Sequence, residues 1–388
     1  MQHRPFGRTG WMASALGFGC MRLPNLGTPD KVDEPEAFRL IRRAIDGGVN
    51  YVDSGYTYHG GQSEVVLGKA LADGYRERVK VVTKMPTWLV NAASDFDRFL
   101  DEQLGRLQTD HLDLYLLHGL GKDSWPKVRD LGVLAWAERA ISSGRIGWLG
   151  FSFHDEYEVF TEIVDAYDRW TACMVMYNYM HKSHPPGAKG VQYASAKGLA
   201  VVAMEPVQGG NLASPPEAIR RLWDDAPARR TPVDWALQWV WNQPEISVVL
   251  SGMSTMTQVE ENLASAGCSG PVTLSAAEVR LVESVAAAYE GIQPIPCTRC
   301  NYCMPCPNGV NIPHNLWLYN TAGMYNQMAQ SRRGYANTKA ENRASACTDC
   351  DQCEPKCPQK IAISDWMPYV GSVLTKKEKF DGRLQPMK

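Results

Sequence analysis

Four side chains that can take part in proton transfer lie along the first third of the chain: Asp53, Tyr58, Lys84 and His118. Asp53 and Tyr58 share one stretch, GVNYVDSGYTYHGG, whereas Lys84 and His118 each end an apolar run, in VKVVTKMP and HLDLYLLHGL. A free tyrosine, with a pKa of about 10, is a weak acid at neutral pH. A neighbouring ammonium lowers that pKa by favouring the phenolate, and a carboxylate keeps the ammonium charged and in place. Tyr58 is therefore expected to be a general acid supported by Lys84 and Asp53.

The segments that must position these residues alternate between strand-like and helix-like. Apolar runs such as LAVVAM and ISVVL suit strands buried on both faces. The expected strands lie near 15–22, 50–54, 79–85, 112–118, 146–152, 172–178, 199–206 and 246–251. Helical periodicity appears between them, for example at 35–46 and 95–106. A small hairpin is expected over residues 1–12.

Eight such units predict an α/β protein of the (β/α)8 TIM-barrel type. In that fold the chemistry belongs at the carboxyl ends of the strands, where Asp53, Lys84, His118 and Ser152 all fall. An open doubly wound sheet is the alternative, but no G-x-G-x-x-G follows any early strand.

The first 290 residues resemble the aldo/keto reductases. Asp53, Tyr58, Lys84 and His118 match the catalytic tetrad of that family in order and context, and RPFGRTG, SEVVLGKAL, GRIGWLGFS and NLASA support the match. The resemblance implies hydride transfer between a nicotinamide cofactor, NAD(P)H, and a small-molecule carbonyl or alcohol substrate. It assigns proton donation to Tyr58 and orientation of the carbonyl to His118.

On the cofactor side the resemblance is less complete. Ser152 matches the serine that holds the nicotinamide carboxamide, but Met174 replaces the usual glutamine and Met204 the usual stacking aromatic residue. The residues expected to contact the cofactor are Asp53, Ser152, Met174, Met204, Glu205, Pro206, Gly210, Gly252, Ser254, Gln258, Glu261 and Asn262. The loop LSGMSTMTQVEEN has no Lys or Arg, and a 2′-phosphate is poorly recognised without a cation. NADH is therefore expected to serve at least as well as NADPH.

Eight of the eleven cysteines form two runs near the C-terminus. The second run, Cys-x2-Cys-x2-Cys-x3-Cys-Pro, matches the bacterial ferredoxin pattern, in which the fourth cysteine ligates the other cluster. We therefore expect two [4Fe–4S] clusters with crossed ligands, one held by Cys297, Cys300, Cys303 and Cys357, the other by Cys347, Cys350, Cys353 and Cys306. Two zinc sites are the alternative, although zinc better suits separate CxxC pairs.

The segment 291–296, GIQPIP, breaks the alternating pattern and predicts a domain boundary, with a barrel over 1–290 and a ferredoxin-like domain over 291–388. The insert between the cysteine runs, about 312–336, looks helical, so the tail resembles an α-helical ferredoxin. Its excess of basic residues would suit an acidic electron-transfer protein as partner. Two other functions stay open. The barrel could bind a flavin that couples to the clusters, or the protein could be a redox sensor that binds a partner.

Composition and charge indicate which partners and which cellular location to expect. The formal net charge is −2, which gives no reason to expect a nucleic-acid partner. No run of eighteen apolar residues is present, so no membrane partner is expected, and the start, MQHRPFGRTG, lacks the apolar core of a signal peptide. A cytoplasmic location is expected.

Overall fold

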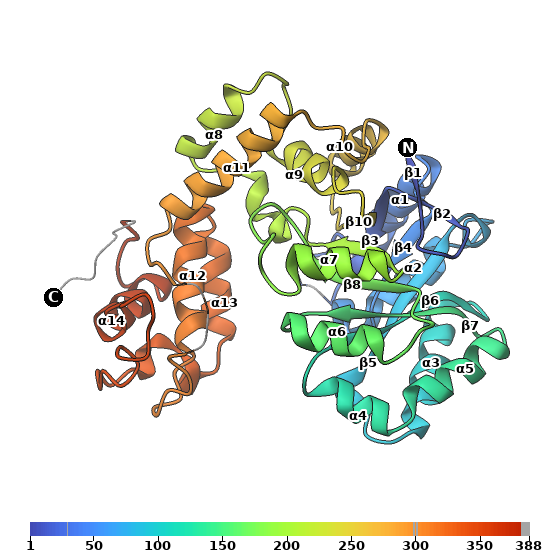
Figure 1. Cartoon of the computed structure of the whole chain (residues 1–388), viewed down its shortest axis with the longest axis horizontal. Helices are drawn as coiled ribbons and strands as arrows, with labels where there is room; N and C mark the ends of the chain where they lie inside the picture. The colour runs from blue at the N-terminus through green and yellow to red at the C-terminus, as the bar shows by residue number, and fades with distance from the viewer. Residues whose placement is uncertain (29, 298, 300–301, 382–388) are drawn as a thin grey trace. The chain divides into compact units, whose positions relative to one another are not determined.

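Eight parallel strands close into a barrel in the order β10, β3, β4, β5, β6, β7, β8, β9 (Figure 1). The computed structural model describes residues 1–28, 30–297, 299 and 302–381. Because all neighbouring strands are parallel, their carboxyl ends open at one end of the barrel. The expected (β/α)8 barrel is confirmed. Its strands are β3 (Leu16–Gly19), β4 (Tyr51–Asp53), β5 (Lys80–Pro86), β6 (Leu112–Leu120), β7 (Ile146–Phe153), β8 (Ala172–Met176), β9 (Ala200–Met204) and β10 (Ile246–Ser251).

A buried apolar cluster joins side chains from many of these strands. Tyr51, Leu114, Leu116 and Val248 belong to it, and Phe6 joins them from the N-terminal segment. That segment forms an antiparallel hairpin of β1 (His3–Pro5) and β2 (Met12–Ser14), as expected. The barrel is therefore a packed core rather than a pore, and its chemistry must lie at the strand ends.

Helices between the strands bury one apolar face each. In the first of them, Ala37, Leu40, Ile41 and Ala44 are buried at helical spacing, and Asp33 caps its N-terminus by accepting a hydrogen bond from the Glu36 amide. The helices of the barrel are α1 (Glu34–Asp46), α2 (Gln62–Ala70), α3 (Ser94–Leu107), α4 (Ser124–Asp130), α5 (Val133–Ser142), α6 (Tyr157–Asp165), α7 (Gly187–Ala196), α9 (Pro232–Trp241) and α10 (Met256–Gly267).

The chain divides into two compact units, one of residues 1–209 and 234–276, the other of residues 210–233 and 277–388. The second unit contains α8 (Glu217–Asp224), α11 (Ala276–Gly291), α12 (Ile312–Met324), α13 (Met328–Asn337) and α14 (Ile363–Leu374). The helical C-terminal region is thus confirmed, and the insert expected at 312–336 forms α12 and α13. The boundary at 290–291 stays a prediction. In the part of the chain that the structure describes, no helix is long and apolar enough to cross a membrane.

Candidate active site and cysteine-lined cavities

Asp53 and Lys84 form a buried ion pair between the first two strands that follow α1. Asp53 is the last residue of β4, and the Lys84 Nζ, on β5, lies 2.5 Å from its Oδ1. The same ammonium donates a hydrogen bond of 2.5 Å to the Ser54 carbonyl. Both side chains are at most 2% exposed. Burial is the largest single influence and would lower the pKa of Lys84, but Asp53 and Tyr58 together outweigh it, so the pKa is raised and the ammonium stays charged.

Tyr58 lies beside this pair. It begins the short 3-10 turn η2 (Tyr58–Gly61), and the Lys84 Nζ lies 4.9 Å from the centre of its ring. A Cβ at position 55 would lie 2.9 Å from the Tyr58 Cζ, so Gly55 is what lets the ring lie against the chain. Burial raises the pKa of Tyr58, and the Lys84 charge opposes that rise. The ammonium therefore only partly offsets the effect of burial on the pKa of Tyr58. The sequence had predicted instead that the ammonium would bring this pKa below its ordinary value.

His118 approaches Tyr58 from β6. The two rings meet edge to face with their centroids 6.0 Å apart, and the Trp88 ring also meets the imidazole edge to face, with centroids 4.9 Å apart. The Thr87 hydroxyl donates a hydrogen bond to the His118 carbonyl and fixes the strand there. Burial, reinforced by the Lys84 charge, lowers the pKa of His118 to about 3. The imidazole is therefore neutral at physiological pH.

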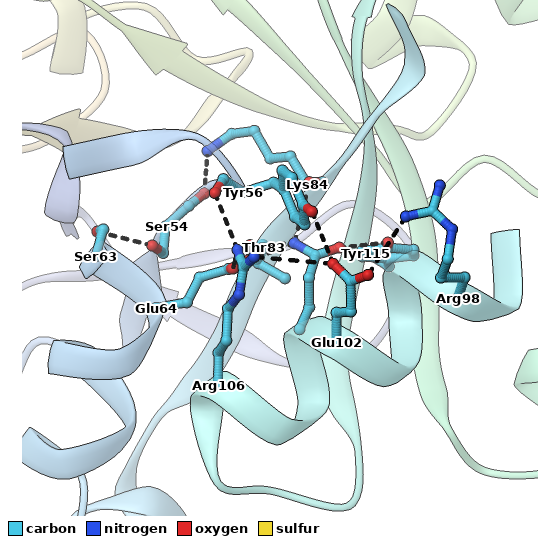
Figure 2. A network of polar contacts seen from close by, with 11 residues as sticks. Ser54, Tyr56, Ser63, Glu64, Thr83, Lys84, Arg98, Glu102, Arg106 and Tyr115 are labelled. Atoms are coloured by element: carbon cyan, nitrogen blue, oxygen red, sulfur yellow. Dashed lines mark hydrogen bonds and ion pairs between the residues drawn. The ribbon is translucent and has the colours of Figure 1, made fainter. Parts of the chain in front are cut away.

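Behind Lys84 lies a buried polar network that sequence reasoning missed (Figure 2). Its centre is Glu64 on α2, which is fully buried. One carboxylate oxygen of Glu64 accepts hydrogen bonds of 2.5 Å from Thr83 and Gln103, and the other pairs with Arg106 at 3.2 Å. The Gln103 amide also donates to the Lys84 carbonyl at 3.1 Å. The β5 backbone at Lys84 is thus bonded to α3, and the Thr83 side chain joins β5 to α2.

The same network reaches the loop that carries Tyr58. Arg106 donates to the Tyr56 carbonyl at 3.2 Å, and the Tyr56 hydroxyl donates to Glu102 at 2.7 Å. A weak signal of this role was present in the sequence, because Glu64 shares a helical face with Leu67 and Leu71 at positions i+3 and i+7.

Of the residues expected to contact a nicotinamide, Ser152 and Met174 lie opposite each other on β7 and β8. The Ser152 hydroxyl accepts a hydrogen bond from the Gly119 amide at 2.8 Å. Met174 is buried in the apolar cluster of the barrel, whereas Met204, the last residue of β9, is half-buried against it. Ser152 and Met174 are therefore buried at the same level of the barrel, and of the three residues only Met204 is partly exposed.

Three further residues predicted to contact the cofactor follow β9 in the chain. Glu205 is exposed with a positive φ of 54°, and its carbonyl accepts a hydrogen bond from the buried Asn178 side chain. Pro206 is buried, and Gly210 belongs to the second compact unit. These residues form a turn that Asn178 holds in place.

The loop after β10 carries the remaining predicted contacts. The Ser254 amide donates to the Gln258 side chain at 2.7 Å, and the Ser254 hydroxyl donates to the Arg22 carbonyl at 2.6 Å. Asn262 is buried and donates to the Ser251 hydroxyl, while Gly252 and Glu261 are exposed. Ser254 and Gln258, two of the residues predicted to contact the cofactor, therefore stabilise the loop by a hydrogen bond within it.

In the tail, cysteines from both runs line the same cavities. One cavity is lined by Cys297, Cys303 and Cys357, and the other by Cys306, Cys347, Cys350 and Cys353. Cys300 lies outside the described residues. The first residues of α12 and α14, Ile312 and Ile363, line both cavities. Within the described ranges no group of three or more His, Cys, Asp or Glu side chains that could hold a metal ion is found.

Comparison with known proteins agrees with this architecture. Residues 15–287 match the Aldo/keto reductase family, and residues 296–362 match a 4Fe-4S dicluster domain. L-galactose dehydrogenase of Arabidopsis thaliana is 28% identical over 281 residues, which cover 67% of this chain and 86% of the relative. The uncharacterized oxidoreductase YrpG of Bacillus subtilis is 25% identical over 341 residues, covering 76% of this chain and 97% of that protein.

Among solved structures, the holo form of the aldo-keto reductase AKR11C1 from Bacillus halodurans superposes with a TM-score of 0.61 at 26% identity. It covers 74% of this chain, and 96% of its own length is matched. The chain belongs to the aldo/keto reductase family and is an oxidoreductase with a 4Fe-4S domain in its helical C-terminal region.

Proposed function

We propose that the barrel interconverts a carbonyl and an alcohol, with a nicotinamide cofactor and the residues Asp53, Tyr58, Lys84 and His118. Aldo/keto reductases use NAD(P)H, which when bound would supply a hydride to the carbonyl carbon, whereas its oxidised form, NAD(P)+, would take one from the alcohol carbon. The observation that carries the proposal is the buried Lys84 ammonium, 4.9 Å from the Tyr58 ring centre and paired with Asp53.

The protein must supply the proton that balances the hydride. Tyr58 donates its phenolic proton to the carbonyl oxygen during reduction and takes it back during oxidation. Burial would make the phenolate costly, and the Lys84 charge offsets that cost, which is why the ammonium must stay protonated. Asp53 keeps it protonated and aimed at Tyr58.

His118 has a different task. Because its pKa is lowered to about 3, its neutral ring can donate one hydrogen bond to the substrate oxygen without competing with Tyr58 as an acid. Trp88 packs against the same ring and is 47% exposed, so an apolar surface borders the position of the substrate.

For the tail we propose two [4Fe–4S] clusters with crossed ligands: Cys297, Cys300, Cys303 and Cys357 for one, and Cys347, Cys350, Cys353 and Cys306 for the other. The support is that each cavity is lined by cysteines from both runs. When bound, such clusters exchange single electrons. Soft thiolates are the donors that iron–sulfur clusters require, and the cavities supply them.

Substitution of Tyr58 tests the function of the barrel. Tyr58→Phe removes only the hydroxyl and should lower kcat for NAD(P)H-dependent carbonyl reduction by about 10²–10⁴, the usual contribution of general acid catalysis. The Kd of the cofactor should change little. Tyr193→Phe is the matched control, because the Tyr193 hydroxyl pairs with Asp165 on the exposed surface. Near wild-type turnover in Tyr58→Phe would refute the role of Tyr58.

Spectroscopy and analysis of anaerobically purified protein test the cofactors. Two cubanes require about eight irons and eight acid-labile sulfides per chain. Flavin bands in the ultraviolet–visible spectrum, together with no binding of either nicotinamide dinucleotide, would replace the nicotinamide proposal by a flavin-containing barrel. Zinc in place of iron would overturn the cluster proposal.

A further inference from the structure

The Glu64 carboxylate connects two backbone segments of the proposed active site. Its Oε1 accepts a hydrogen bond of 2.5 Å from Gln103, whose amide also donates to the Lys84 carbonyl at 3.1 Å. Its Oε2 pairs with Arg106 at 3.2 Å, and the same guanidinium nitrogen donates to the Tyr56 carbonyl at 3.2 Å (Figure 2). One carboxylate oxygen thus serves the strand that carries the lysine, and the other serves the loop that carries the proposed proton donor.

Arg106 holds Tyr56 by more than this backbone contact. Its guanidinium carbon lies 4.3 Å from the centre of the Tyr56 ring. The Tyr56 hydroxyl donates a hydrogen bond of 2.7 Å to Glu102, which lies one turn before Arg106 on α3. Tyr56 is thus fixed at its backbone, its ring and its hydroxyl, two residues before Tyr58 in the chain.

Packing alone does not account for a carboxylate at this place. The Glu64 side chain is fully buried, and burying a charge is costly unless the charge is paired and hydrogen-bonded. Well-packed apolar residues in place of a buried ion pair often leave a protein as stable as before, or more stable. The partners of the carboxylate, rather than its burial, therefore indicate its role: they fix the geometry of two backbone segments.

We propose that Glu64 is a positioning residue that holds the Tyr58 phenol beside the Lys84 ammonium, a role that rests on the proposed function of the barrel. Glu64 acts through the backbone, by way of Arg106 on one side and Gln103 on the other. The ammonium lies 4.9 Å from the centre of the Tyr58 ring, and the attraction between charges falls as their separation grows. A shift of either backbone segment would therefore weaken the support that the ammonium gives to proton transfer.

Two variants of the full chain interrupt one connection each. Glu64→Gln keeps the shape of the side chain but removes the charge that pairs with Arg106, so the hold on Tyr56 is weakened. Gln103→Met keeps the pair of Glu64 with Arg106 but removes the donor to the Lys84 carbonyl. Each should lower kcat for the reduction of benzaldehyde by about 10–100-fold, because a remote change that misplaces a reacting group by about 1 Å can cost that much. The Kd of NADH or NADPH, measured by quenching of tryptophan fluorescence, should stay within about twofold.

A double variant separates positioning from stability. Adding Arg106→Met to Glu64→Gln removes the charge that the single variant leaves without its partner, so the free energy of unfolding in urea should recover in part. The kcat should stay as low as in Glu64→Gln, because no guanidinium then holds the Tyr56 carbonyl. Asp101→Asn is the matched control and should leave kcat unchanged, since Asp101 lies on α3 but pairs with Arg145 at the surface.

Each outcome decides one question. A double variant that regains kcat together with stability would overturn the positioning role and leave the proposed function standing. Near wild-type kcat in Gln103→Met, or a loss that appears in the Kd of the dinucleotide instead of in kcat, would do the same. A wild-type protein that binds neither NADH nor NADPH would overturn the proposed function, and the role of Glu64 with it.

Discussion

Removing the charge of Asp53 should cost far more than removing that of an ordinary surface carboxylate. Asp53→Asn removes the negative charge that pairs with the Lys84 ammonium, which is 1% exposed, and leaves it only uncharged acceptors such as the Ser54 carbonyl. An unpaired charge in a dry site is expensive, and breaking a buried ion pair typically costs about 3–5 kcal/mol. Burial then also lowers the pKa of Lys84, so the lysine sheds its proton and no longer offsets the burial of Tyr58.

The free energy that the Asp53–Lys84 pair contributes to folding can be measured by comparing single and double variants. Asp53→Asn and Lys84→Met each leave one buried polar group unpaired, whereas the double variant leaves neither charge. The free energy of unfolding that the double variant loses should therefore be smaller, by several kcal/mol, than the sum of the losses in the two single variants. Urea-induced unfolding followed by tryptophan fluorescence gives the three free energies of unfolding relative to wild type.

A surface ion pair in the same part of the fold supplies the control. Lys69 on α2 pairs with Glu34 on α1 at 2.9 Å, and the two side chains are 41% and 37% exposed. Exposed pairs contribute at most about 1 kcal/mol, so Glu34→Gln should change stability little. If Asp53→Asn costs no more than Glu34→Gln, the carboxyl group was not paired with a charged lysine and the reasoning fails.

Two further predictions concern pH and the clusters. An unfolded histidine titrates near pH 6.5 and folded His118 at about 3, so between these values the unfolded chain binds one more proton. The stability that neutral His118 retains above pH 6.5 is lost as pH falls: about 2 kcal/mol between pH 7 and 5, and urea titrations of His118→Gln should lack that part of the slope. Cys357→Ala should weaken the cluster built on Cys297 and spare the one built on Cys347, as iron content and EPR of the reduced protein will show. Loss of the Cys347 cluster alone would mean sequential pairing.

The barrel could be predicted from the sequence because its strands are buried on both faces and read as continuous apolar runs. The observed strands lie within a few residues of the expected ones. Asp53 is the last residue of β4, and Lys84 and His118 lie two residues before the ends of β5 and β6, all on the side where the parallel barrel puts the carboxyl ends. Local pattern was sufficient there. The spacing of the cysteines in the tail was likewise sufficient to predict a 4Fe-4S domain.

The polar network around Glu64 could not be predicted in the same way. A glutamate in an amphipathic helix is ordinarily solvated, and its partners Gln103 and Arg106 come from α3, about forty residues away. Arg22 is a stronger case. It lies beside Gly209 and Gly252 only because barrel closure brings the ends of the first, seventh and eighth strands together. No local pattern in CMRLPNLG contains that information.

The two cavities of the tail suggest what role the proposed clusters have beside the proposed reaction of the barrel. In the reaction proposed for the barrel, hydride and proton transfer move an electron pair, so that reaction balances without a one-electron carrier. Ile312 and Ile363 lie between the cavities at the starts of α12 and α14, and cysteines near residue 300 share each cavity with cysteines near residue 350. Metal binding contributes folding free energy to domains with small cores. We therefore infer that the clusters first of all join the two halves of the tail, and that any electron transfer through them requires an acceptor other than the hydride.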